Sequence, residues 1–326
     1  MKKALIIGVS GQDGAYLARL LLEKEYSVIG LVRRGGASQA AFPKLEWLGI
    51  ADDVRFAEGD LTDLSSLLRV LTDHKPDEVY NLAAQSVVQS SWRQPIQTTA
   101  VTAAGALNVL EALRLALPSA RFFQASSSEM FGHTERPSQD ETTPFHPRSP
   151  YAVAKLFAHW STVNYRDSAG LHASSGIMFN HESPLRDIAF VTRKITDGVA
   201  RIKAGQVREL RLGNLDSRRD WGHARDYVAA MHLMLQQEKP DDYVVATGRT
   251  VAVRDICRIA FDHVGLVAED HVVVDPDFVR PTEVRCVRGD WSKAKARLGW
   301  SPATSLEDMI VEMVEADLRR VARHPA

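Results

Sequence analysis

Short apolar runs alternate with longer amphipathic segments along the first half of the chain. The apolar runs predict buried strands over residues 4–9, 27–32, 54–57, 78–82 and 121–125. Apolar positions at helical spacing predict helices over 16–22, 64–71 and about 96–117. Continuous apolar strands that alternate with helices indicate a parallel sheet covered on both faces, and such crossovers are nearly always right-handed. We therefore expect an α/β fold built on a doubly wound parallel sheet.

The second half continues this pattern less regularly. It predicts helices over about 151–168, 192–203 and 224–237, strands over 172–179 and 243–246, and a loop over 180–187. The tail from residue 253 is expected to be mainly helical, with an irregular stretch at 275–281. Because no Pro/Gly-rich linker separates two halves, we expect two interleaved domains. Residues 1–180 plus 222–250 would form the sheet domain, and 181–221 plus 251–326 a smaller, mostly α-helical substrate domain.

Composition narrows the class of protein. The 326 residues are 45% hydrophobic and 25% charged, with a net charge of -1, which is ordinary for a folded domain and argues against nucleic acid as a partner. Two cysteines exclude a disulfide framework and fit a reducing compartment. The first apolar run breaks at Gly8, too early for a signal peptide, and no run approaches the roughly 20 apolar residues of a membrane helix. We expect a cytoplasmic protein without a membrane partner.

A glycine-rich turn joins the first predicted strand to the first predicted helix. Its spacing is GxxGxxG, from Gly8 through Gly11 to Gly14. Glycines there permit a tight turn and let the backbone approach a pyrophosphate, which the N-terminus of the helix then faces. The position favours a dinucleotide over an empty turn. The predicted cofactor contacts in this turn are Gly8, Ser10, Gly11, Gln12, Asp13 and Gly14. A doubly wound sheet with this turn is of the Rossmann type.

The end of the second strand indicates which dinucleotide binds. An acidic residue there would accept from the ribose 2′-hydroxyl of NAD, whereas Arg33 and Arg34 suit the 2′-phosphate of NADP. Asp60, after the third strand, is placed to accept from the adenine amino group, although it could instead cap the next helix. Further contacts are expected at the ends of strands three and four, from Leu61, Leu82, Ala83 and Ala84.

Reactive side chains follow the fifth strand. Tyr151 and Lys155 lie four apart, on one face of a helix, and an ammonium beside a phenol is expected to lower the pKa of Tyr151 so that it can act as a base. Both residues are also predicted to contact the cofactor. Ser127 and Glu129 come at the carboxyl end of the fifth strand, at the mouth of the site. Because a simple ketoreductase needs no carboxylate, Glu129 indicates a second proton transfer. No spacing among histidines and cysteines predicts a metal site.

Longer runs identify a family. The YxxxK pair with the glycine turn is typical of extended short-chain dehydrogenase/reductases. The runs SSSEMFG, ETTPFHPRSPYAVAK, NHESP, RDWG and RPTEV in series resemble GDP-mannose 4,6-dehydratases over nearly the whole chain. The resemblance implies a GDP-sugar substrate and a homodimer or homotetramer. It also implies substrate contacts from Ser86, Asn180, Lys194, Arg219, Arg280 and Glu283.

The resemblance implies a mechanism as well. Tyr151 would deprotonate the C4 hydroxyl while NADP⁺ accepts hydride, and the 4-ketone would acidify the C5 proton. Glu129 would remove that proton and help water leave from C6, with Ser127 bonding near C4, before hydride returns to C6. Relatives usually carry threonine at Ser127, threonine at Ile7, and glycine at Asp187, where aspartate is disfavoured if the backbone requires a positive φ. Gly35 and Gly36 replace small hydroxyl residues.

Three other functions fit parts of this pattern. Dehydration of a related GDP-sugar such as GDP-manno-heptose would use nearly the same residues. A sugar-nucleotide 4-ketoreductase or epimerase would not need Glu129. A non-catalytic NADP-binding sensor could dispense with Tyr151, Lys155 and Glu129 together, and all three are present.

Overall fold

A seven-stranded sheet forms the centre of the molecule. The computed structural model describes residues 1–33, 42–278 and 286–323. The strand order is β10-β6-β5-β4-β1-β2-β3, and every neighbouring pair is parallel. This order confirms the predicted doubly wound fold. The strands are β1 (Lys3–Ile7), β2 (Ser27–Val32), β3 (Arg55–Glu58), β4 (Glu78–Asn81), β5 (Arg121–Ser127), β6 (Ala173–Met178) and β10 (Asp242–Val245).

Helices cover both faces of this sheet. In β1, Leu5 and Ile7 belong to one core cluster and Ala4 and Ile6 to another, so both faces of the strand are buried. Burial on both faces explains why the strands read as unbroken apolar runs. One face packs against α4 (Leu64–His74), α7 (Gly105–Ala116) and α8 (Pro150–Ala169), and the other against α1 (Gln12–Glu23), α10 (Ala224–Gln236) and α12 (Ser292–Leu298).

The predicted helix over 96–117 is a series of consecutive helical segments. The chain runs from α5 (Val88–Arg93) through α6 (Pro95–Thr98) into a π-helical stretch, Thr99–Ala104, and then into α7. A π-helical stretch often marks a functional site, and Ala100 and Val101 line a pocket described below. Two short α-helices, α3 (Pro43–Trp47) and α5, were not predicted.

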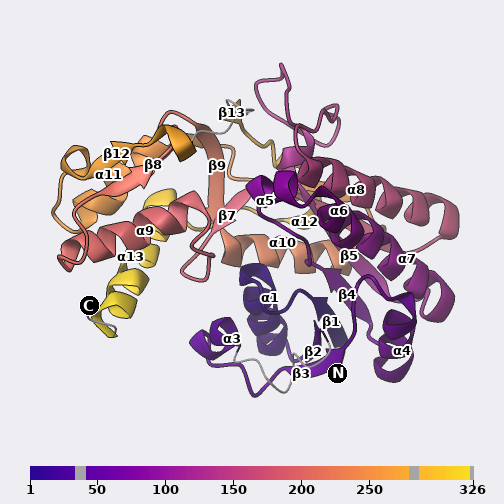
Figure 1. Ribbon diagram of the computed structural model, residues 1–326. Helices are drawn as coiled ribbons and strands as arrows, with labels where there is room; N and C mark the ends of the chain where they lie inside the picture. The colour runs from indigo at the N-terminus through magenta and orange to yellow at the C-terminus, as the bar shows by residue number, and fades with distance from the viewer. Residues whose placement is uncertain (34–41, 279–285, 324–326) are drawn as a thin grey trace.

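Most of the rest of the chain forms a smaller lobe beside the large sheet, with a core of its own (Figure 1). We call this lobe the second layer. Its helices are α9 (Val191–Lys203), α11 (Val253–His263) and α13 (Leu306–Arg323). Its strands are β7 (Asn180–Glu182), β8 (Leu210–Leu212), β9 (Arg218–His223), β11 (Thr250–Ala252), β12 (Val272–Val274) and β13 (Cys286–Val287). The prediction of a loop over 180–187 is wrong at its start, because β7 pairs with β9. A three-residue strand that depends on a distant partner leaves no periodic signal in the sequence.

The chain crosses between the two layers more than once. It leaves the large sheet after β6, builds β7, α9, β8 and β9, returns for α10 and β10, and leaves again at β11. The two-part division at 180, 222 and 250 stays a prediction. Among the described residues no helix has the length and apolar character needed to cross a membrane.

Candidate active site

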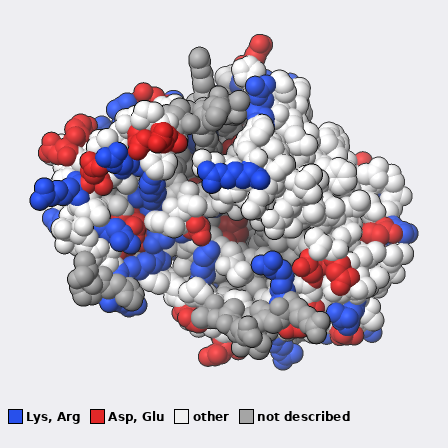
Figure 2. Space-filling view, in the orientation of Figure 1, with Lys and Arg blue, Asp and Glu red and all other residues white. Residues whose placement is uncertain are grey.

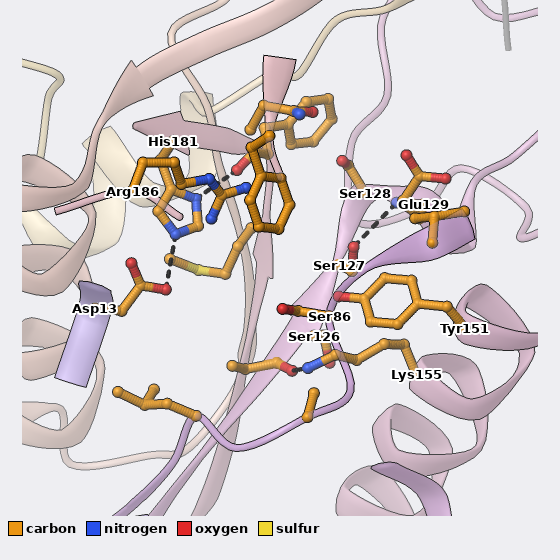
Figure 3. Close-up of a pocket in the computed structure, with 18 residues that line it drawn as sticks. Asp13, Ser86, Ser126, Ser127, Ser128, Glu129, Tyr151, Lys155, His181 and Arg186 are labelled. Atoms are coloured by element: carbon orange, nitrogen blue, oxygen red, sulfur yellow. Dashed lines mark hydrogen bonds and ion pairs between the residues drawn. The ribbon is translucent and has the colours of Figure 1, made fainter. Parts of the chain in front are cut away.

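Two elements bring the predicted reactive groups together. Helix α8 starts at a cap, where the Ser149 hydroxyl accepts from the Ala152 amide at 3.1 Å, so Tyr151 and Lys155 lie in its first turns. Strand β5 ends at Ser127, whose hydroxyl accepts from the Glu129 amide at 3.3 Å. Figure 3 shows Ser127, Glu129, Tyr151 and Lys155 on one wall of a pocket that they line.

Lys155 is buried and points into this wall. Its ammonium donates to the Ala125 carbonyl at 2.7 Å and lies 5.9 Å from the centre of the Tyr151 ring. Burial lowers the pKa of Lys155 to about 8. The bond to Ala125 fixes the ammonium against the end of β5, beside the phenol.

The prediction that the pKa of Tyr151 is lowered is wrong for this structure. Burial raises the pKa of Tyr151 to about 12, the hydrogen bond with Ser127 lowers it in part, and the negative charge of Glu129 raises it further. Desolvation of the phenolate therefore outweighs the Ser127 hydrogen bond and the positive charge of Arg186.

The opposite wall carries a charged pair. His181 Nδ1 lies 2.6 Å from the Phe179 carbonyl oxygen and Nε2 lies 2.9 Å from Asp13 Oδ2. Burial opposes ionisation of Asp13, but the charge of His181 and its hydrogen bond hold the pKa of Asp13 at about 2. Both ring nitrogens thus face acceptors, which requires both to carry protons. Burial likewise opposes the imidazolium, and the Asp13 carboxylate outweighs it, so the pKa of His181 is raised.

His181 and Arg186 are residues that sequence reasoning did not assign to the site. His181 and Asp13 are 168 positions apart, so no local pattern could join them. Arg186 lines both this pocket and the groove described next.

The adjoining groove has the size and lining expected of a dinucleotide site. Its volume is about 890 Å³, at the upper end of the usual range for ligand pockets. The predicted residues that line it are Gly8, Ser10, Gly11, Gln12, Asp13, Gly14, Arg33, Asp60, Leu61, Leu82, Ala83 and Ala84. Sequence reasoning missed the lining residues Gln85, Gln97, Ala100 and Val101. Arg34, Gly35 and Gly36 lie outside the described residues.

The glycine turn fits a pyrophosphate. Gly8 has a φ of +96°, and a Cβ on Gly14 would lie 2.2 Å from the Gly8 carbonyl oxygen. Gly11 is the N-cap of α1 and provides no side-chain cap. The first residues of the helix line the groove, where their free amide groups suit an anion. Asp60 accepts from the Thr62 amide and hydroxyl, which lowers the pKa of Asp60 and keeps it ionised in the groove.

The predicted substrate residues separate into three groups. Ser86 and Asn180 line the pocket with Tyr151. Lys194 stacks its ammonium 3.7 Å from the centre of the Phe278 ring, and Arg219 donates to the Ser217 hydroxyl and the Arg218 carbonyl, so both lie beyond the lining of the two pockets. Arg280 and Glu283 fall outside the described residues. These substrate contacts stay predictions.

Asp187 fits its backbone without strain. The residues other than glycine with positive φ in the described chain are Glu25 and Lys75. Asp187 accepts from the Ala189 amide at 2.9 Å, a local turn that suits aspartate. The replacement of the family's glycine therefore needs no left-handed conformation.

Comparison with known sequences identifies the family. The profile of the family described as GDP-mannose 4,6 dehydratase matches residues 5–313. The chain belongs to the GDP-mannose 4,6-dehydratase family. It is 51% identical to GDP-mannose 4,6 dehydratase 1 of Arabidopsis thaliana, covering 99% of this chain and 91% of that protein. It is 44% identical to GDP-mannose 4,6 dehydratase of Homo sapiens, covering 99% and 93%.

Solved structures agree with this family assignment at the level of the fold. RMD from Pseudomonas aeruginosa, solved in complex with NADPH, superposes with a TM-score of 0.82 at 25% identity, over 98% of this chain and 100% of that chain. DesIV from Streptomyces venezuelae, a dTDP-glucose 4,6-dehydratase, gives a TM-score of 0.86 at 23% identity, over 98% of each chain. The dehydratase-family chain thus has the architecture of known sugar-nucleotide enzymes.

Proposed function

We propose that this protein is an NADP-dependent GDP-mannose 4,6-dehydratase, which converts GDP-mannose to GDP-4-keto-6-deoxymannose and water. One observation carries the proposal. A Tyr151–Lys155 pair and the additional carboxylate of Glu129 line a single pocket, which adjoins a groove of dinucleotide size. Membership of the dehydratase family gives that combination its specific chemistry.

The proposed roles are those that the family resemblance implies, and the shared pocket supports them. Tyr151 takes the proton of the C4 hydroxyl, with Lys155 beside it to stabilise the phenolate. Glu129 removes the C5 proton once C4 is a ketone and returns a proton to the departing C6 hydroxyl, which leaves as water. Ser127, hydrogen-bonded to Tyr151, is placed to bond near C4.

The groove is proposed to hold NADP. Gly8, Gly11 and Gly14 would hold its pyrophosphate, and a bound nicotinamide would supply the acceptor and later the donor of the hydride. Arg33 lines the groove close enough to Asp60 for its charge to help lower the pKa of that carboxyl, and its guanidinium suits a 2′-phosphate.

We expect NADP to bind more tightly than NAD, and Arg33→Ser to reduce that difference in affinity, as measured by fluorescence titration.

The decisive experiment is incubation of the purified protein with GDP-mannose. We expect a product lighter by one water that carries a 4-ketone, with no net build-up of NADPH absorbance, because the hydride returns to the sugar. GDP-manno-heptose is tested in parallel, and a higher kcat/KM for the heptose would reassign the substrate. Net NADPH formation would instead indicate an ordinary dehydrogenase.

A substitution at Glu129 separates dehydration from simple reduction. Glu129→Gln keeps the shape of the side chain but cannot take the C5 proton, so we expect loss of product formation by at least about 100-fold, within the usual range for a general base. NADP affinity should be unchanged. Unchanged dehydration by this variant would show that Glu129 is not the C5 base, whereas sugar-nucleotide turnover without water loss in both wild type and variant would favour a 4-ketoreductase or epimerase.

We also propose that the protein forms a homodimer or homotetramer in the cytoplasm. Exposed apolar side chains on α5, α6 and α8 gather on one face: Trp92, Ile96, Val153, Phe157 and Trp160. Figure 2 shows few charged side chains over these helices. The α8 members are spaced at i, i+4 and i+7, as in helix-pairing seams, which favours a second copy of the chain as the partner.

A further inference from the structure

A buried carboxylate on the last helix gathers two arginines. Asp317 of α13 has a fully buried side chain. Arg193 of α9 donates through Nε to both of its oxygens, at 3.0 and 2.9 Å, and Arg320 donates through Nη1 at 2.7 Å. The Thr196 hydroxyl donates to Oδ2 at 2.7 Å. A carboxylate with this many donors holds each guanidinium in one orientation.

Both arginines reach onward to the same loop. Arg193 Nη1 donates to the Arg186 carbonyl at 3.1 Å, and Arg320 Nη2 donates to the Pro184 carbonyl at 2.6 Å. The two carbonyls belong to the turn between β7 and α9, and Asp317 is therefore one bridging side chain away from each. Without its charge, two guanidinium groups would face each other in a partly buried position, which favours their separation.

The side chain of Arg186 lies where the two pockets meet. It lines both the groove with the glycine turn and the pocket with Tyr151. The buried carboxylate of Glu182 lies 2.9 Å from its Nε, and its guanidinium stacks 3.5 Å from the centre of the Phe190 ring. Figure 3 shows Arg186 beside His181, across the pocket from Tyr151. Its carbonyl oxygen accepts from Arg193, so contacts restrain both its backbone and its side chain.

We propose that Asp317 is a positioning residue for Arg186, and that Arg193 and Arg320 transmit its effect to the loop over the site. The guanidinium of Arg320 also lies 4.3 Å from the centre of the Trp47 ring on α3, which connects α13 to the part of the fold that carries the cofactor groove. The C-terminal helix thereby sets the position of a cation at the junction of dinucleotide and sugar. The inference rests on the proposed function for the identity of those two ligands.

The test is a double-mutant cycle read by NADP binding. Asp317→Asn removes the charge and keeps the shape, and we expect it to weaken NADP binding about tenfold, as is usual for coupling inside one hydrogen-bonded network. In an Arg186→Ala background the same change should alter the dissociation constant by less than about twofold. Glu315→Gln is the matched control, since this carboxylate of the same helix is half exposed and pairs with His263. The control should bind NADP normally.

The outcomes separate the inference from the proposed function. Unchanged NADP binding by Asp317→Asn, or an equal loss in both backgrounds, would overturn the positioning role. If Asp317→Asn does not fold, Arg193→Lys serves in the same cycle, because a lysine keeps the charge but cannot bond Asp317 and Arg186 together. Failure of the wild-type protein to dehydrate GDP-mannose would overturn only the proposed function. The double-mutant cycle on NADP binding would still test the positioning role of Asp317.

Discussion

The Asp13–His181 pair makes stability depend on pH in a defined window. The pKa of Asp13 is lowered from 3.8 to about 2, so its contribution is present above 3.8 and is lost as the pH falls towards 2. The pKa of His181 is raised from 6.5, so its contribution is complete below 6.5 and is lost as the pH rises through the raised value. We expect Asp13→Asn to lower the free energy of unfolding most between about pH 4 and 6.5, as measured by urea denaturation at a series of pH values.

Above this window the difference between wild type and Asp13→Asn should shrink. A neutral His181 that donates from Nδ1 to Phe179 presents the lone pair of Nε2 to the Asp13 carboxylate, which is also an acceptor. The side-chain amide of an asparagine at position 13 can instead donate a hydrogen bond to that lone pair. Asp52→Asn, at an exposed turn position, is the control and should change the free energy of unfolding by no more than about 0.5 kcal/mol. A constant effect of Asp13→Asn from pH 5 to 9 would show that His181 is not held as an imidazolium.

Which site residues could be predicted depends on how local their signal is. Ser127, Glu129, Tyr151 and Lys155 share a pocket because the end of a parallel strand and the start of the next helix lie at the same edge of the sheet. Arg186 and His181 reach the site through β7 and its distant partner β9, which no spacing reports. The direction of the Tyr151 shift depends on burial, which sequence alone does not measure.

At the scale of elements, the approach of α1 to the turn after β1 should be sensitive to a single methyl group. A Cβ on Gly14 would lie 2.2 Å from the Gly8 oxygen and 2.6 Å from the Val9 Cα, all backbone. We expect Gly14→Ala to lower the free energy of unfolding by about 3 kcal/mol, because the helix must move away from the strand. Urea denaturation measures the loss, and NADP titration should show weaker binding.

The matched control for this change is Gly49→Ala. Gly49 has a φ of +70° and nothing within 4 Å of its added Cβ, so only backbone strain of about 1 kcal/mol is expected. If Gly14→Ala is no more destabilising than Gly49→Ala, the contact between α1 and the turn is looser than the structure indicates.

Elements with a long periodic pattern were predictable, and short ones were not. The strands of the large sheet and helices α8, α9 and α10 follow the predicted ranges within a few residues. Strands β8, β11 and β12 contain three residues each, which is fewer than the four to eight residues over which alternation can be recognised. The π-helical stretch before α7 changes the hydrogen-bond register without changing the apolar pattern, so the sequence reads as one helix.

For the whole molecule, the division into two interleaved domains stays a prediction from the missing linker, whereas the small sheets of the second layer leave no signal in the sequence. Strand β9 pairs with β7, β11 and β13, so residues from 180 to 287 meet only in the folded chain. The hydrogen bonds between Asp317 and Arg193 likewise join α13 to α9, over 124 positions of the sequence. Contacts of this kind connect the C-terminal helix to the site, although the helix itself has an ordinary amphipathic sequence.

The exposed apolar face provides the last prediction. Ile96 and Phe157 are 83% and 47% exposed, on helices that pack against each other. If two copies pair through this face, a carboxylate at both positions must be desolvated at the interface, which is strongly unfavourable. We expect wild type to sediment as a dimer or larger assembly and Ile96→Glu/Phe157→Glu to sediment as a folded monomer. Val267→Glu, at an exposed apolar position in the second layer, should leave the assembly intact. A double variant that assembles like wild type would place the interface elsewhere, whereas a monomeric wild type would remove the second copy as the partner.

Because α8 also carries Tyr151, the monomeric variant further reports whether pairing keeps that helix in place. A lower kcat at unchanged NADP affinity would show that the assembly supports the catalytic helix.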